Sequence, residues 1–250
     1  MELDALAYLP MSFNSHGWQR GLVPQVRVEY DNNGYYDTAK GKYLNGGTIT
    51  PALQFYVMRD MAHSGIFPKY GFGGVARWRF SFNGGENFGD VSSLYLYAYL
   101  PGLAPNHGVK LSMSTQHHNA DGKNYYLGNL VDMPRGYDED FYSENYFMGT
   151  FDYAFPIYLG DTHVWRLAYL KRMQVIPFAD YAVGKFAAGR NGKAGNSALY
   201  SCGTSVLVDF APFSIGLECS IGVRYSYNGN NGGLPGKGSA VHFLFSTSLY

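Results

Sequence analysis

The sequence predicts an all-β fold, and within that class an antiparallel up-and-down transmembrane β-barrel of about ten strands. The first observation behind this prediction is that apolar and polar residues alternate along many stretches of the chain. The second is composition: 17% of the 250 residues are aromatic and only 15% are charged, whereas an average soluble domain has roughly a quarter of its residues charged. The third is that long and short connections alternate between the stretches.

The individual strands follow from the alternation, taken in chain order. In the first stretch Val26, Val28 and Tyr30 alternate with polar neighbours, and strict alternation predicts a strand with one buried face. With their flanks most stretches reach about 10 residues, beyond the usual length of about five or six and close to the roughly 9–11 that cross a membrane. Helical periodicity is weak throughout. The expected strands contain residues 25–30, 53–58, 76–82, 94–100, 109–114, 146–157, 172–180, 205–210, 218–225 and 240–250.

The connections divide into two groups that alternate along the chain. In an up-and-down meander, alternate connections lie at opposite ends of the sheet, so one end carries long loops and the other short turns. This asymmetry is typical of outer-membrane barrels, which have short periplasmic turns and long loops on the cell surface. The long group is residues 31–47, 119–143, 184–197 and 228–238, with 83–89 intermediate; the short group is 62–69, 101–106, 160–163 and 211–213.

Two other fold classes share part of this pattern. A soluble sandwich or barrel also alternates apolar and polar residues, and it stays open as an alternative that strand length, aromatic content, low charge and loop asymmetry disfavour. A membrane-spanning helix is not expected, because no run of 18 apolar residues occurs. The first seven residues lack the basic and apolar regions of a secretory signal.

Charge and motif content exclude further functions. Lys+Arg and Asp+Glu both total 19, and a nucleic-acid-binding protein is expected to be basic. No Gly-x-Ser-x-Gly, phosphate-binding loop or His-Glu-x-x-His motif occurs, so we expect neither an enzyme nor a cofactor. The adjacent His117 and His118 would point to opposite faces of a strand, and no metal site is expected there. Cys202 and Cys219 fall on the apolar face of neighbouring strands, where they act as small hydrophobic residues or form a disulfide.

Three short motifs occur in order in the second half of the chain. The longest loop contains Pro134-Arg135-Gly136-Tyr137, the next strand contains Tyr153-Ala154-Phe155-Pro156, and the strand after it contains Phe178-Ala179-Asp180. This succession resembles the C-terminal barrel of the outer-membrane assembly superfamily, the BamA-like or bacterial surface antigen proteins. The resemblance covers residues 20–250 and is best from Pro134 onward. A plain surface turn at Pro134–Tyr137, with Asp180 as a solvent-facing strand end, is the alternative that the residues alone leave open.

The resemblance implies a fold and a function. The loop would fold back into the lumen, where Arg135 would contact Asp180 and Phe178. The chain would form part of a larger family barrel in a Gram-negative outer membrane, with residues 1–19 as a remnant or plug-like segment before the barrel at 20–250. Its class inserts or transports other proteins, so its partners would be the lipid bilayer, client outer-membrane proteins and periplasmic modules. The alternative is a passive pore or structural barrel without insertase activity.

The alternation also places further charged residues on the lumen face. A buried carboxylate is costly unless it is paired, so the inward carboxylates compete with Asp180 for the inward cations. Mixed charges of this kind are consistent with a plugged or water-filled barrel interior. The expected inward residues are Arg77, Arg79, Asp152, Arg172, Asp209, Glu218 and Arg224.

Overall fold

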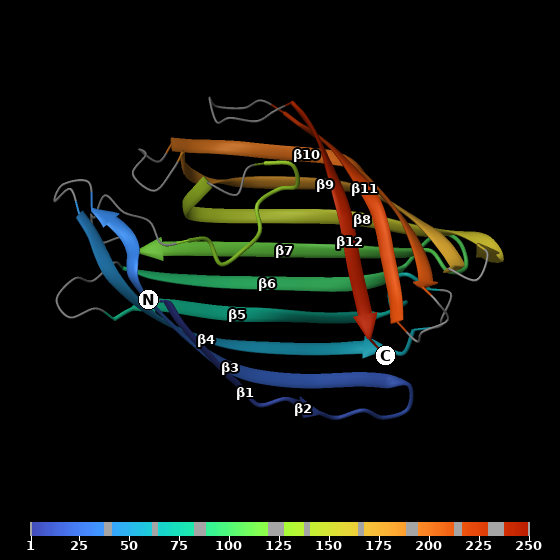
Figure 1. Ribbon diagram of the computed structural model, residues 1–250, viewed down its shortest axis with the longest axis horizontal. Coiled ribbons are helices and arrows are strands. Elements are labelled where there is room, and N and C mark those ends of the chain that lie inside the picture. Colours follow the sequence, from blue (N-terminus) through green and yellow to red (C-terminus); the bar gives the residue numbers. More distant parts are fainter. Residues whose placement is uncertain are drawn as a thin grey trace.

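The computed structural model is entirely β over the residues that it describes (Figure 1). Among these residues there is no helix, and therefore none long and apolar enough to cross a membrane. The described residues are 2–37, 42–61, 65–82, 89–119, 128–137, 141–164, 168–188, 195–212, 217–229 and 238–249.

In the described residues twelve strands form one antiparallel sheet, in which each long strand pairs with the next long one along the chain. The short strand β2 pairs only with β3, off the main path. The strands are β1 (Glu2–Tyr8), β2 (Met11–Ser12), β3 (Trp18–Asp37), β4 (Lys42–Arg59), β5 (Gly71–Ser81), β6 (Asp90–Pro101), β7 (Gly108–Asn119), β8 (Phe141–Val164), β9 (Ala168–Ala188), β10 (Gly195–Pro212), β11 (Leu217–Asn228) and β12 (Ser239–Leu249).

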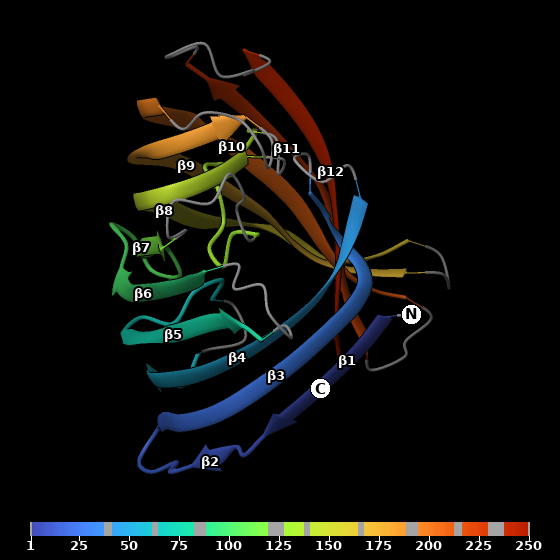
Figure 2. The same ribbon diagram turned by 90° about the vertical axis from the view of Figure 1, so that its left-hand side faces the viewer.

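The sheet curls into a trough but does not close, which corrects the expectation of a barrel (Figure 2). Within the described part of the chain, β1 pairs only with β3 and β12 pairs only with β11. Alternation predicts strands and the pairing of chain neighbours, whereas closure requires strand number, tilt and register to agree around the whole circumference. The all-β class and the up-and-down meander are confirmed.

Strand number and strand length also differ from the expectation. Residues 2–8 and 11–12, expected to precede the barrel, form β1 and β2 on the edge of the same sheet. Several expected connections lie inside strands, since β3 and β4 pair through most of residues 31–47 and β8 continues past residues 160–163. Polar, glycine-containing segments pair through their backbones as well as apolar segments do, so a prediction from composition underestimates the length of these strands.

The pleat gives the sheet an apolar outer face and a polar inner face. Large side chains such as Phe72, Trp78 and Phe151 are exposed on the outer face, while the inner face carries the serines, threonines and charges. The main apolar cluster lies on the inner face, where strand residues pack against a loop. Its members are Val131, Tyr137, Tyr146, Met148, Ala182, Phe186 and Leu199.

Candidate functional site: an anchored loop on the inner face

Residues 128–137, here called the inner loop, lie on the concave side of the sheet in both views (Figures 1 and 2). They precede β8 in the chain, but most of their contacts are with β8, β9, β10 and β11. Pro134 is fully buried and Tyr137 nearly so. A plain surface turn would leave these side chains in solvent, whereas here they are buried.

The tip of the inner loop is a tight turn. The Tyr137 amide donates to the Pro134 carbonyl at 3.2 Å, and Gly136 between them has a φ of +87°. A turn with a positive φ at its third residue is the type II geometry, which favours glycine there. A Cβ at Gly136 would also clash with the Ser226 Oγ. The turn therefore needs glycine for its backbone angle and for space, and it directs Arg135 towards β9.

Arg135 forms a two-pronged ion pair with Asp180. The guanidinium Nε and Nη2 donate to the two carboxylate oxygens at 2.9 and 2.5 Å, and the Arg135 backbone amide donates to Oδ2 at 2.9 Å. The Asp180 side chain is only 1% exposed. Three charge-assisted hydrogen bonds compensate this buried carboxylate, and the planar guanidinium suits two-pronged binding.

A second carboxylate and an aromatic ring complete the surroundings of Arg135. Its Nη1 lies 2.6 Å from Asp152 Oδ1, and the guanidinium carbon lies 3.7 Å from the centre of the Phe178 ring. Burial alone would lower the pKa of Arg135, but the hydrogen bonds and charges of Asp180 and Asp152 outweigh it and raise the pKa. The arginine therefore stays charged while it bridges two carboxylates and covers one ring.

Strand register explains why these groups converge. Asp180 pairs in register with Ser201, which pairs with Asn228, so one row crosses β9, β10 and β11. Every member binds the loop: Asp180 holds the Arg135 side chain, Ser201 Oγ donates to the Arg135 carbonyl at 2.5 Å, and Asn228 Nδ2 donates to the Gly136 carbonyl. Ser201 and Asn228 were not predicted as site residues from the sequence, although period two places both on the inner face.

The adjoining row supplies the ring platform. Asp152, Phe178 and Gly203 pair in register across β8, β9 and β10. A Cβ at Gly203 would lie 2.9 Å from the Phe178 ring. Glycine at this position therefore lets the ring lie against the sheet, which leaves its other face for the guanidinium of Arg135.

Both ends of the inner loop are fastened to the sheet. At the tip, the Tyr137 hydroxyl donates to the carbonyls of Gly229 at 2.8 Å and Tyr200 at 3.1 Å, and burial raises the pKa of this hydroxyl. At the start, the Leu130 amide donates to Gln116 Oε1 at 2.7 Å, and Gln116 Nε2 donates to Asn129 Oδ1 at 2.9 Å. Side chains from the sheet therefore replace the backbone pairing that the loop lacks.

Most of the other expected inward charges bind neighbours on the same face. Arg77 and Arg79 donate to the inner-loop carbonyls of Leu130 and Gly128, at 2.9 and 3.4 Å. Arg172 donates to Asp209 at 2.6 Å. Asp209 also accepts hydrogen bonds from Gln174 Nε2 and Ser220 Oγ.

The other expected inward carboxylates pair with cations, of which Arg135 is one. Asp152 shares the arginine with Asp180, whereas Asp209 binds Arg172 and Glu218 binds Lys171. Lys171 was missed, because its partner lies on a strand that is not its neighbour in sequence. Arg224 Nε donates to Ser205 Oγ at 3.1 Å on the same inner face.

None of His117, His118, Cys202 and Cys219 lines the polar cavity that contains Arg135. His117 is exposed and His118 is buried, as expected for adjacent residues of one strand. Cys202 is exposed, Cys219 is buried, and both are free thiols. In the described part of the chain no three His, Cys, Asp or Glu side chains are grouped to hold a metal ion.

No family model, curated protein or solved structure matches this chain.

Proposed function

We propose that this chain forms a wall of strands in a Gram-negative outer membrane and belongs to the class that inserts or translocates other proteins. The observation that carries the proposal is the contact of Arg135 with Asp180 and Phe178 on the inner face. Those residues come from the loop motif and the strand motif that resemble the surface antigen family. The inner loop would act as a brace for strands β8–β11, and the action would be non-enzymatic.

The membrane part of the proposal is supported by the outer face. Bulky apolar side chains are exposed there from β5 to β12, including Phe147, Ile221 and Phe245. Extended exposed apolar surfaces mark contact with a membrane or partner. We expect the purified chain to require detergent and to show a β-rich circular dichroism spectrum. A monodisperse monomer in detergent-free buffer would overturn the membrane location.

The insertion part is supported by the two edges of the sheet. The edge of β1 that faces away from β3 and the edge of β12 that faces away from β11 carry backbone groups without a sheet partner among the described residues. Such edges recruit strands from other chains. On β12 the outward side chains are strongly exposed, with Phe243 at 87%. This edge is where we place the contact with a client strand.

A passive pore or structural wall is the second candidate. A polar cavity of about 790 Å³ lies between the inner loop and the strands and is lined in part by Lys110, Asp152 and Arg224. A water-filled path along this cavity would conduct ions. In that function the inner loop constricts the path and the edges have no client.

A photo-crosslinking amino acid separates the two candidates. It is placed at Phe243 on β12 and, as a matched control, at Phe147, an outward phenylalanine of β8. With the chain in phospholipid vesicles, an unfolded outer-membrane β-barrel client is added and the mixture is irradiated. Client crosslinks at position 243 and not at 147 are expected. Equal or absent crosslinks, together with steady conductance in planar bilayers, would establish the pore instead.

A further inference from the structure

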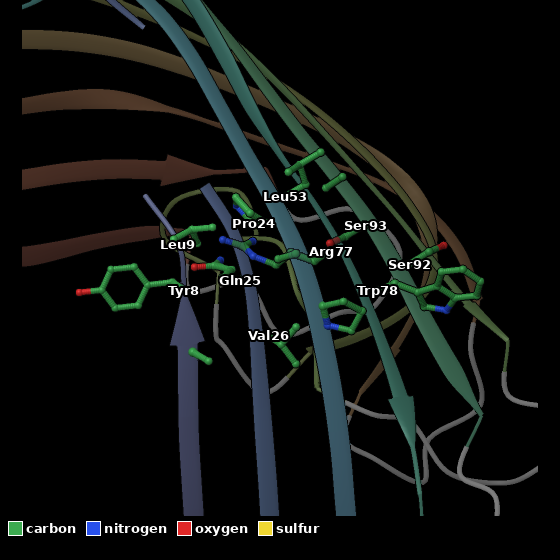
Figure 3. A pocket seen from close by; sticks show the side chains of 14 residues that line it. Tyr8, Leu9, Pro24, Gln25, Val26, Leu53, Arg77, Trp78, Ser92 and Ser93 are labelled. Carbon is green, nitrogen blue, oxygen red and sulfur yellow. The ribbon is translucent and has the colours of Figure 1, made fainter. Parts of the chain in front are cut away.

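A shallow apolar groove of about 770 Å³ crosses β1, β3, β4, β5 and β6 on the outer face (Figure 3). Its floor is a line of residues that pair in register from each strand to the next. The pleat directs their side chains to the inner face, so they meet the groove through the backbone. These floor residues are Tyr8, Gln25, Ala52, Arg77 and Ser93.

Two rows of outward side chains form the walls. The rows are two residues apart along each strand, so their backbones are about 6.7 Å apart, and five strands give the groove a length of roughly 19 Å. Alanines and prolines interrupt both rows and keep the floor open, and no wall residue has an ionisable side chain. One wall is Leu9, Pro24, Leu53 and Ala76; the other is Ala7, Val26, Pro51, Trp78 and Ser92.

We infer that this groove binds one acyl chain of a membrane phospholipid, an inference that rests on the proposed membrane location. A helix, about 10–12 Å across, is too wide for it. An extended polypeptide lying across the strands could not pair its backbone groups with them and would leave those groups unsatisfied. A hydrocarbon chain has no hydrogen bonds to satisfy, and the uncharged walls complement it.

Trp78 lies at the β6 end of the groove and reports on its occupant. The indole is 55% exposed, and its Nε1 donates to Asp90 Oδ2 at 3.2 Å. The polar atom of the ring therefore has a protein partner, and the ring face remains available to hydrocarbon. The groove is also continuous with the exposed apolar outer face, so a bilayer lipid can enter it from the side.

Fluorescence quenching by phospholipids with brominated acyl chains tests the inference. The chain has three tryptophans, and the double variant Trp18→Phe/Trp165→Phe leaves Trp78 alone. The brominated lipid has acyl chains long enough to fill the groove and is diluted into vesicles of a shorter-chain lipid that is not brominated, and quenching is measured against its mole fraction. A groove that binds the longer chain preferentially gives more quenching of Trp78 at low mole fraction than random exchange of neighbouring lipids does. Quenching that follows the random-exchange curve would overturn the groove as a site.

Two pairs of variants locate the quencher. Ala76→Phe fills the groove, while Ala98→Phe adds the same ring to the outer face of β6 outside it. Ala7→Phe fills the far end of the groove, and Ala5→Phe is its control on the same strand. The excess quenching should be lost in both filled variants and kept in both controls. Equal effects within each pair would overturn the inference.

Vesicle flotation distinguishes failure of this inference from failure of the proposed function. A chain that floats with the vesicles but shows only random quenching lacks the acyl site and keeps its membrane location. A chain that neither floats nor is quenched overturns both. Variants are compared only where their circular dichroism retains the β spectrum of the parent; if one of the filled variants loses it, the pair on the opposite wall gives the test.

Discussion

Arg135 and Asp180 are joined by three hydrogen bonds, two from the guanidinium and one from the Arg135 backbone amide. The two residues are 45 positions apart in sequence. The pair therefore connects the tip of the inner loop to the middle of β9, and the same guanidinium extends to Asp152 and Phe178. A single side chain thus fastens the loop to two strands.

The first prediction concerns the free energy of unfolding. Arg135→Ala should lower it by about 3–5 kcal/mol, because two buried carboxylates lose their cation. Asp180→Ala should cost less, since Arg135 keeps Asp152. The double variant should cost much less than the sum of the two. Urea unfolding in detergent measures these values, and additive costs would show that the residues do not interact.

The second prediction concerns the turn at Gly136. A left-handed backbone angle alone costs a non-glycine residue roughly 1–2 kcal/mol. Gly136→Ala should destabilise the protein by more than this, because the new Cβ also clashes with Ser226 and Asn228. Gly238→Ala is the matched control, as Gly238 has a φ of +69° but open space around it. Thermal unfolding compares the two variants. If they are equally destabilised, the close contact contributes nothing.

A third prediction concerns the hydroxyl of Tyr137. Tyr137→Phe removes the donor to the carbonyls of Gly229 and Tyr200, and a net loss of about 0.5–1.5 kcal/mol is expected for a hydrogen bond of this kind. Tyr225→Phe, on the exposed outer face, should leave stability unchanged. Limited proteolysis should cut the inner loop faster in the first variant only. Equal rates of cutting in the two variants would show that the Tyr137 hydroxyl does not help to anchor the inner loop.

The fourth prediction concerns orientation in the membrane. In a background with Cys202→Ser and Cys219→Ser, single cysteines are introduced at four positions and treated with a membrane-impermeant reagent on whole cells. Gly192 and Asn230, which lie outside the described residues, are in the long connections and should react. Asp161 and Pro212, at the other end of the sheet, should not react. Similar labelling at both ends would contradict the assignment.

Local sequence patterns already indicate the all-β class and the composition of the two faces of the sheet. Alternation is a local property, so Val26 and Arg27 already show which side chains share a face of β3. The motif residues Arg135 and Asp180 were also evident from sequence, through their resemblance to a family. Their contact is present in the structure, whereas the role that the resemblance implies stays a proposal.

Other features depend on how distant strands are placed relative to one another. Whether the sheet closes depends on twist, tilt and register summed over all strands, and no local stretch contains that sum. Ser201 and Asn228 became part of the site because the register of β9, β10 and β11 placed them beside Asp180. Likewise, Glu218 binds Lys171 through the pairing of distant segments. Such contacts depend on relative strand positions, which period two leaves undetermined.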